Sequence, residues 1–278
     1  MAHDGDSPFS LQLDQTNRGL AVITGASSGI GRELARHAAA AGFDLVLAAD
    51  DHGIHNVAVE LRERGSIVDA MCVDLSTTQG MDDFLQFIDD VDRPVDVLVA
   101  NAGIDCGGAF VDTEISQTLA VVDTNIRGSL SLIQHIAKQM GARSAGKILI
   151  TASIVSVLPG PYHATYCATK AFLYSFALAL RYEMKERGVS VTCLMPGVTD
   201  TAVYKRAGMQ NTWVGRLRKE DPAFVAQIAL KALSTRRAVA VPGVLNKILI
   251  GLAALTPVAL LTAVHALATR PGKSRKDR

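Results

Sequence analysis

Tyr166 and Lys170 lie one helical turn apart in the segment Tyr-Cys-Ala-Thr-Lys. Residues spaced i, i+4 share one face of a helix, so we expect the ammonium of Lys170 to lie near the phenol of Tyr166. A nearby positive charge favours the phenolate, which makes the hydroxyl usable as an acid or a base near neutral pH. Taken alone, the spacing also fits a solvated tyrosine beside a surface lysine. The pair predicts proton transfer only if other residues support it.

A glycine-rich segment, Thr24-Gly-Ala-Ser-Ser-Gly-Ile-Gly31, follows a short apolar run and precedes a stretch rich in alanine and leucine. Strand, tight turn and helix in this order are what a dinucleotide-binding unit requires. Gly25 permits the tight turn, Gly29 lets the backbone approach a pyrophosphate, and Gly31 permits close helix packing. The free N–H groups at the helix N-terminus then suit phosphate. A purely structural turn is the alternative interpretation.

The elements that must position these residues alternate along the chain. We expect strands at 20–24, 44–48, 67–73, 95–100, 147–151 and 189–194, and helices at 32–41, 54–64, 81–91, 115–140, 164–187 and 222–233. This alternation predicts an α/β fold, a doubly wound parallel sheet (Rossmann-like) with helices on both faces. We predict a flexible N-terminal tail (1–18), one domain over 19–245, and an apolar helical extension with a basic end (246–278).

The 278 residues are 49% hydrophobic and 20% charged, with a formal net charge of +1. This composition supplies a large core and excludes bulk disorder. It offers no electrostatic reason to bind nucleic acid. The four cysteines and seven histidines show no zinc spacing, so we predict no metal site. The absence of a disulfide framework indicates a reducing, cytoplasmic location.

From about Leu20 to Thr201 the chain resembles the short-chain dehydrogenase/reductase family, in its compact single-domain branch. The glycine turn matches the family's TGxxxGxG motif, and Tyr166 with Lys170 matches YxxxK. The other matches are Asp74-Leu75 at the adenine position, Asn101-Ala102-Gly103 at a strand end, Asn125 and Ser153 for the active-site asparagine and serine, and Pro196-Gly197 with Thr199 and Thr201 for PGxxxT.

The resemblance implies an NAD(P)-dependent oxidoreductase that interconverts a secondary alcohol and a carbonyl compound by hydride transfer. It implies that Tyr166 is the general acid/base and that Lys170 lowers the phenol pKa and binds the nicotinamide ribose. It also implies that Ser153 donates a hydrogen bond to the carbonyl oxygen and that Asn125 positions a water. The implied cofactor-binding residues are Gly25, Ser27, Ser28, Gly29, Ile30, Gly31, Asp50, Asp74, Leu75, Asn101, Ala102, Gly103, Tyr166, Lys170, Pro196, Gly197 and Thr199.

A redox sensor and an epimerase or dehydratase are the two alternative functions. A redox sensor that binds the nucleotide without turnover does not require a proton relay, so the intact Ser153, Tyr166 and Lys170 argue against it. An epimerase or dehydratase on this scaffold tends to have a longer chain and a TGxxGxxG turn, and neither feature is present.

Asp50 and Asp51 follow the second expected strand and bear on the choice of cofactor. Carboxylates near the adenosine ribose accept its hydroxyls and repel a 2′-phosphate. We therefore predict NAD(H), with NADP(H) as the alternative. A helix-capping role for the two aspartates is the other interpretation.

The segment after Pro196-Gly197, which in this family folds over the substrate, is apolar, with Val203, Tyr204, Met209, Trp213 and Val214. It predicts a lipophilic small-molecule substrate, although packing beneath a lid or at a subunit contact explains the composition equally well. The resemblance also implies a homodimer or homotetramer in which the helices 115–140 and 164–187 meet across subunits.

The run from Ile248 to Thr269 contains no charged residue and precedes a basic end. Thr256-Pro257 is expected to split it into two helices, each too short for the ~30 Å hydrocarbon core. Three roles remain open for this run. In decreasing order of preference they are a helix pair that is buried or faces another subunit, an anchor on the membrane surface, and a true membrane span. Peripheral membrane association is thus the alternative to a purely cytoplasmic location.

Overall fold

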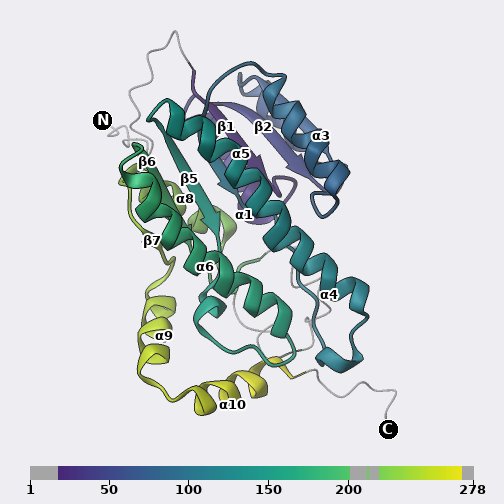
Figure 1. The fold of residues 1–278 in the computed structure, drawn as a ribbon, viewed down its shortest axis with the longest axis vertical. Coiled ribbons are helices and arrows are strands. Elements are labelled where there is room, and N and C mark those ends of the chain that lie inside the picture. The colour runs from purple at the N-terminus through teal and green to yellow at the C-terminus, as the bar shows by residue number, and fades with distance from the viewer. Residues whose placement is uncertain (1–17, 201–211, 213–218, 271–278) are drawn as a thin grey trace, which may run out of the picture.

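The computed structural model describes residues 18–200, 212 and 219–270 (Figure 1). Within these residues one sheet of seven parallel strands has the order β3-β2-β1-β4-β5-β6-β7. The strands are β1 (Leu20–Thr24), β2 (Asp44–Ala49), β3 (Val68–Cys72), β4 (Val95–Ala100), β5 (Gly146–Thr151), β6 (Val189–Leu194) and β7 (Val239–Ala240). The predicted doubly wound parallel sheet is confirmed.

Helices cover both faces of this sheet. On one face lie α1 (Gly29–Ala40), α2 (Gly53–Glu63) and α8 (Pro222–Ser234). On the other lie α3 (Thr78–Asp89), α5 (Ser129–Ala142) and α6 (Ala164–Lys185), with α4 (Ile115–Val122) extending the line of α5 (Figure 1). The helices predicted from periodicity are therefore present, with ends that differ by a few residues.

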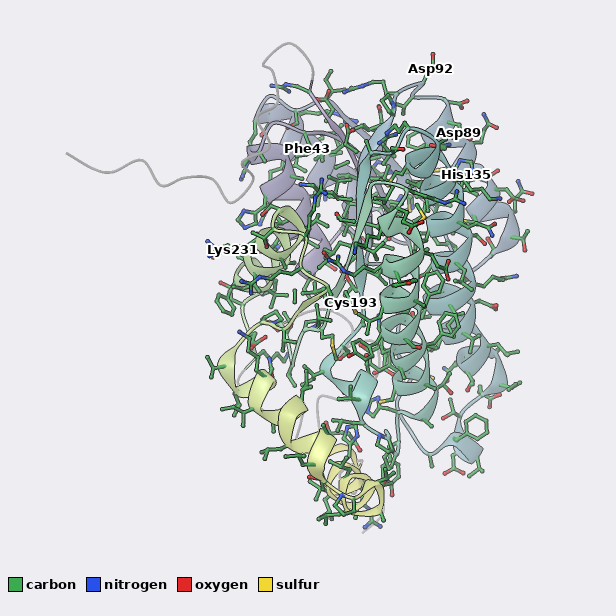
Figure 2. All side chains as sticks on the ribbon, turned by 60° about the vertical axis from the view of Figure 1, so that its left-hand side comes forward. Phe43, Asp89, Asp92, His135, Cys193 and Lys231 are labelled. Carbon is green, nitrogen blue, oxygen red and sulfur yellow. The ribbon has the colours of Figure 1, made fainter. Side chains whose placement is uncertain are left out.

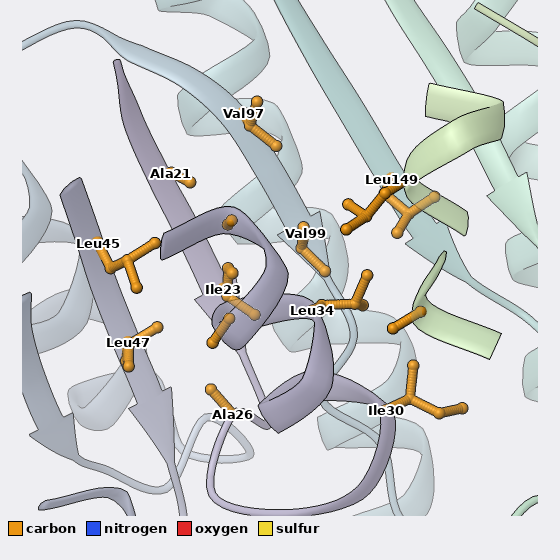
Figure 3. Packing of buried hydrophobic residues seen from close by; sticks show 14 of the residues in the cluster. Ala21, Ile23, Ala26, Ile30, Leu34, Leu45, Leu47, Val97, Val99 and Leu149 are labelled. Atoms are coloured by element: carbon orange, nitrogen blue, oxygen red, sulfur yellow. The ribbon is translucent and has the colours of Figure 1, made fainter. Parts of the chain in front are cut away.

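Alternate residues of each strand enter two separate hydrophobic cores. In β1, Ala21 and Ile23 pack beneath α1, whereas Leu20 and Val22 belong to the core on the opposite face. Figure 3 shows the first of these cores, where Leu34 of α1 lies over Ile23. Burial on both faces explains why the strands are almost wholly apolar rather than alternating between apolar and polar.

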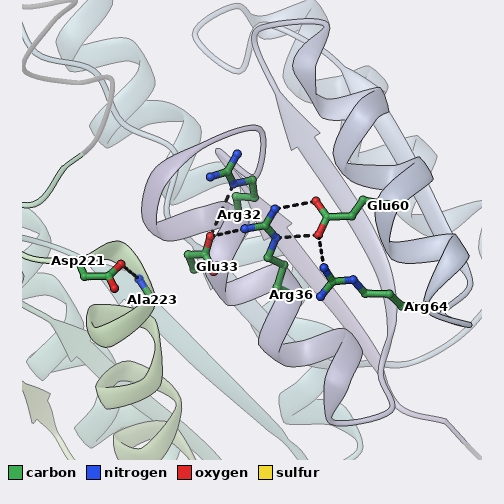
Figure 4. A network of polar contacts seen from close by, with 7 residues as sticks. All are labelled: Arg32, Glu33, Arg36, Glu60, Arg64, Asp221 and Ala223. Carbon is green, nitrogen blue, oxygen red and sulfur yellow. Dashed lines mark hydrogen bonds and ion pairs between the residues drawn. The ribbon is translucent and has the colours of Figure 1, made fainter.

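An ion-pair network joins α1 to α2 and fixes the helix that follows the glycine turn (Figure 4). Arg36 Nη2 lies 2.7 Å from Glu60 Oε2, and Arg36 Nη1 lies 2.7 Å from Glu33 Oε1. Hydrogen bonding to the Arg36 guanidinium holds the pKa of Glu60 below its ordinary value. Because these groups are partly exposed, we regard the network as orienting α1 more than stabilising it.

One predicted helix is divided in the structure. The expected single helix over 115–140 consists of α4, a π-helical turn η2 (Asp123–Gly128) and α5. Gly128 lies at the end of this turn, where an added Cβ would come 2.6 Å from the carbonyl oxygen of Leu75. The wider turn thus occurs where the helix passes the loop after β3, and π-turns are frequent at functional sites.

The apolar C-terminal run forms two helices, α9 (Val244–Leu255) and α10 (Val258–Thr269), separated at Thr256-Pro257 as predicted. They form an arm at one end of the molecule (Figure 1). No helix among the described residues is both long and apolar enough to cross a membrane. The predicted N-terminal tail lies almost entirely outside the described residues, and the domain limits stay a prediction.

Candidate active site

A cavity of about 420 Å³ opens at the carboxyl ends of the strands, where the strand order reverses between β1 and β4. This position is the usual ligand site of an open parallel sheet, and the volume is in the range of cofactor and substrate sites. Among the described residues, every predicted catalytic and cofactor-binding residue except Asn125 lines this cavity. Residues up to 174 positions apart in sequence, Gly25 and Thr199, therefore share one site.

The glycine turn has the backbone that its sequence predicts. Gly25 and Gly29 adopt positive φ angles of 66° and 55°, which side-chain-bearing residues adopt at a cost. At Gly31 an added Cβ would lie 2.1 Å from the carbonyl oxygen of Gly25. The start of α1 therefore packs directly on the turn, and its N-terminal N–H groups face the cavity side of the sheet. This cradle, which a single methyl group would fill, fits a dinucleotide pyrophosphate.

Asn101 ties together the ends of three strands behind the turn. Its Nδ2 donates to the carbonyl oxygen of Thr24 at 3.1 Å, and its Oδ1 accepts from Thr151 Oγ1 at 3.1 Å. Thr24 Oγ1 accepts in turn from the backbone N–H groups of Asn101 and Ala102. These bonds brace β1, β4 and β5 against one another where the cavity floor lies. The sequence indicated Asn101 but gave no sign of the contributions of Thr24 and Thr151.

The two aspartates after β2 have different environments. Asp51 accepts from Ser27 Oγ at 2.6 Å and from the backbone N–H of Gly53 at 2.9 Å, so it braces the glycine turn and the start of α2. Asp50 lines the cavity. The capping interpretation thus describes Asp51, whereas the predicted contact of Asp50 with a cofactor ribose stays a prediction.

Tyr166 and Lys170 project from the first turns of α6 into the cavity. Lys170 Nζ lies 5.7 Å from the centre of the Tyr166 ring, consistent with the i, i+4 expectation. The ammonium donates to the carbonyl oxygen of Thr151 at 2.9 Å, and the side chain is 4% exposed. Because Lys170 is buried, the alternative interpretation of a solvated tyrosine beside a surface lysine is excluded.

Burial has a consequence for the charge on Lys170. Desolvation lowers its pKa to about 8, and the opposing influences of Cys193 and Asp105 only partly offset this. Below about pH 8 the cation is present and can favour the Tyr166 phenolate. Above that pH the neutral amine dominates and the assistance is lost.

The same shift predicts how stability varies with pH. Between about pH 8 and 10.5 the unfolded chain binds a proton on Lys170 that the folded chain has lost, so stability should rise with pH in this window. Below about pH 8 both states are protonated and folding bears the full cost of burying the ammonium. We expect the Lys170→Met variant to lack this rise, which amounts to about 1.4 kcal/mol per pH unit at most.

Urea unfolding of both proteins across this range measures the difference. The matched control is Lys138→Met, an exposed lysine of α5, whose profile should follow that of the wild type. Parallel profiles for the wild type and Lys170→Met would show that the buried amine is not the titrating group.

Ser153 lies at the end of β5, on the wall of the cavity near α6. Its side chain is 8% exposed, and its Oγ accepts from the Val155 N–H at 3.3 Å and lies 3.4 Å from the carbonyl oxygen of Pro196. Ser156 Oγ donates to the Lys170 carbonyl oxygen at 2.9 Å, which joins this turn to α6. The serine hydroxyl is thus held by weak contacts that a substrate oxygen can replace.

Asn125 has a different position from the other predicted residues. It is fully buried in η2, and its side chain exchanges two 2.9 Å hydrogen bonds with the backbone of Ile104 and donates to Thr169 Oγ1 at 3.0 Å. These bonds hold the loop after β4 against the helix that carries Tyr166 and Lys170. The side-chain amide therefore faces the protein rather than the cavity, and the water-positioning role that the motif implied for Asn125 stays a prediction.

A buried pair that the sequence did not reveal supports the same loop. His163 Nδ1 lies 3.0 Å from Asp105 Oδ2, and both side chains are almost fully buried. The N–H of Gly108 also donates to the carbonyl oxygen of Tyr162 at 2.9 Å. The residues of each contact are more than fifty positions apart, so no local pattern could have indicated them.

Several predictions fall outside the described residues. Thr201 and the apolar positions 203, 204, 209, 213 and 214 belong to this group. Among the residues that the structure does describe, no cluster of three or more His, Cys, Asp or Glu could hold a metal ion. All four cysteines are free, and burial raises the pKa of the Cys167 and Cys193 thiols to about 12.

Comparison with known proteins now decides the family. A family model described as short chain dehydrogenase matches residues 19–212. The chain belongs to the short-chain dehydrogenase/reductase family. The protein is accordingly an oxidoreductase of this family, with a site that fits a nicotinamide dinucleotide.

Individual short-chain dehydrogenases/reductases agree with this assignment. A dehydrogenase/reductase SDR family member 7B from Xenopus tropicalis is 31% identical over 274 residues, which are 92% of this chain and 86% of the relative. A short-chain dehydrogenase from Sphingobium yanoikuyae, solved with NADPH, is 27% identical with a TM-score of 0.76, covering 86% of this chain and 96% of that one. A bulky-bulky ketone specific alcohol dehydrogenase from Comamonas testosteroni is 26% identical with a TM-score of 0.73, covering 87% and 96%.

Proposed function

We propose that this short-chain dehydrogenase/reductase interconverts a secondary alcohol and a carbonyl compound, with Tyr166 as the general acid/base. The observation that carries the proposal is the convergence of Tyr166, buried Lys170 and Ser153 on the cavity that the glycine turn closes. A bound nicotinamide dinucleotide supplies or accepts the hydride. The protein then has to hold the cofactor and manage one proton and one developing charge.

Each residue has a defined part in this scheme. The Tyr166 hydroxyl donates its proton to the substrate oxygen in reduction and takes it back in oxidation. The Lys170 cation, held by the Thr151 carbonyl, stabilises negative charge on the phenol oxygen. Ser153 donates a hydrogen bond to the substrate oxygen as charge develops on it. For Asn125 we propose the water-positioning role that the motif implies, with its side chain held in place by Ile104 and Thr169.

We propose NAD(H) as the preferred cofactor. Asp50 lines the cavity next to the turn that Asp51 and Ser27 brace, and a carboxylate there repels a 2′-phosphate. The Sphingobium relative was solved with NADPH, and a 3-ketoacyl-(acyl-carrier-protein) reductase from Brucella melitensis, 26% identical, was solved with NADH. The family fold therefore accommodates both cofactors, and we propose that the charge of Asp50 determines the preference.

The substrate is proposed to be a lipophilic carbonyl compound or alcohol. Among the described residues, Ile104, Ala120 and Ala152 add apolar surface to the cavity that Ser153 also lines. The related Comamonas enzyme acts on bulky ketones. We also propose that the protein forms a homodimer or homotetramer. The exposed Ile115 and Leu119 of α4 offer apolar surface for such a contact.

Nicotinamide absorbance, followed with a panel of ketones and alcohols, tests the proposed function. We expect turnover of bulky apolar ketones with NADH, and a higher kcat/KM with NADH than with NADPH. Turnover restricted to small polar sugars would overturn the substrate class, and a strong preference for NADPH would overturn the assignment of Asp50. Tight NADH binding without turnover of any carbonyl compound would favour the redox sensor.

A further inference from the structure

Helices α9 and α10 carry large aliphatic side chains on the outside of the molecule. Val244 and Val258, the first residues of the two helices, are exposed. The other exposed positions are Leu245, Ile248, Leu249, Leu252 and Leu255 in α9, and Leu260, Val264 and Leu267 in α10. These other positions recur mainly at three- and four-residue spacings, so each set forms one stripe along its helix. Leu255 is 85% exposed and Leu267 is 75% exposed. Soluble monomers seldom leave so many neighbouring aliphatic groups in water.

The same helices contact the rest of the protein through polar groups. Asn246 of α9 donates to Glu220 Oε1 at 2.9 Å and to the Pro242 carbonyl oxygen at 2.8 Å. In α10, His265 Nδ1 lies 2.7 Å from the carbonyl oxygen of Pro159. Thr269 Oγ1 donates to the carbonyl oxygen of Pro161 at 2.8 Å. Ala253 and Ile250 of α9 also face the protein. Most of the large aliphatic side chains of the two helices nevertheless lie on the outside, whereas a helix that packs on a core normally buries them.

The charged residues of α9 and of the sequence from Arg270 onward are mainly basic. No Asp or Glu occurs between Pro222 and Lys276. Lys247 and Arg270 are exposed at the two described ends of the arm. The sequence that follows contains Lys273, Arg275, Lys276 and Arg278, with Asp277 as the one acidic residue. Apolar stripes flanked by cations match the composition of helices that lie on anionic membranes.

We propose that α9 and α10 form a docking surface for an anionic phospholipid bilayer. Each helix has 12 residues and is about 18 Å long, so it lies within the interface and does not cross the ~30 Å hydrocarbon core. The aliphatic stripes enter the boundary between headgroups and acyl chains while the basic residues bind lipid phosphates. A second copy of the chain is a poorer occupant, because a symmetric contact would bring the same cations together.

The surface is adjacent to the site described above. Thr269 and His265 bind the segment containing Pro159 and Pro161, which leads directly into the helix that carries Tyr166. Figure 1 shows α10 beneath that end of α6, and Figure 2 shows the arm at the same end of the molecule from another side. Docking through the arm therefore turns the cavity end of the protein toward the bilayer. The docking proposal does not depend on the proposed reaction.

Flotation of the full-length protein with phosphatidylcholine vesicles, with and without phosphatidylglycerol, tests the proposal. We expect at least about tenfold stronger partitioning when phosphatidylglycerol is present, and a loss of this gain at high salt. The Lys247→Gln/Arg270→Gln variant should partition about twenty-fivefold less, since each basic residue contributes about fivefold. The Leu252→Glu/Leu267→Glu variant should partition at least about tenfold less.

The matched control is Ile67→Glu, an aliphatic residue 61% exposed at the opposite end of the sheet, which should bind vesicles like the wild type. Circular dichroism and Tm establish that each variant is folded. Equal partitioning onto vesicles with and without phosphatidylglycerol, or none onto either, would overturn the proposal. Light scattering that showed a dimer dissociated by Leu252→Glu/Leu267→Glu, with unchanged vesicle binding, would assign the surface to a second copy and overturn it as well.

Discussion

Replacing Tyr166 with Phe should lower kcat for carbonyl reduction by about 10²–10⁴-fold, the range that a positioned general acid contributes. The substitution removes one oxygen atom and leaves the ring beside Lys170, so the packing of α6 should be preserved. Burial of the Lys170 ammonium makes the effect large, since the cation favours negative charge on that oxygen at 4% solvent exposure. Affinity for NADH should change by less than about threefold, because the cradle at the glycine turn is untouched.

Single-turnover and steady-state kinetics, with NADH binding followed by fluorescence, separate these effects. Tyr182→Phe is the matched control, because Tyr182 lies on the same helix and is 83% exposed. It should retain the kcat of the wild type. A Tyr166→Phe enzyme with nearly normal kcat would show that another group, or water, transfers the proton, and the proposed mechanism would be wrong.

Substituting Ala for Gly31 should destabilise the protein by about 2–4 kcal/mol and weaken NADH binding at least about tenfold. The new methyl group would lie 2.1 Å from the Gly25 carbonyl oxygen and 2.7 Å from Asn101 Nδ2. The first of these atoms is backbone and cannot rotate away. The second belongs to the side chain that ties Thr24 to Thr151, so relief there would loosen the ends of three strands.

The control for this substitution is Gly251→Ala. Gly251 lies inside α9, and no atom lies within 4 Å of the position that its Cβ would occupy. Because Ala forms helices better than Gly, the control should be neutral or stabilising by up to about 1 kcal/mol. Urea unfolding and NADH titration of both variants provide the comparison. Normal stability and normal cofactor affinity in Gly31→Ala would mean that α1 does not pack on the turn as described.

Much of this protein could be predicted from local patterns. The strands are short apolar runs and the helices are longer periodic stretches, and each pattern depends on residues close in sequence. The positions of Gly25, Gly31, Tyr166 and Lys170 followed from spacing, because a tight turn and one helix face are local geometries. Pro257 likewise marked the break between α9 and α10, since proline ends one helix and begins another.

Contacts between distant segments could not be predicted in this way. The motif indicated Asn125 as an active-site residue, but it did not indicate that the amide binds Ile104 and Thr169, which lie 21 and 44 positions away. The pair of His163 and Asp105 gave no signal for the same reason. The single helix expected over 115–140 contains a π-turn because it passes the loop after β3, and helix periodicity carries no information about that loop.

The sequence by itself determined the order of elements, the parallel sheet and the residue types available at its carboxyl edge, because these depend on local burial patterns and turn chemistry. Only the tertiary structure decided the electrostatic state and the exposure of particular groups. Packing around α6 lowers the pKa of Lys170 to about 8, whereas the sequence indicated only a lysine near a tyrosine. Contacts of Asn246 with Glu220, and of His265 and Thr269 with the segment 159–161, orient α9 and α10 so that their aliphatic stripes face outward. Burial and orientation depend on what packs against a side chain, and that partner is usually far away along the chain.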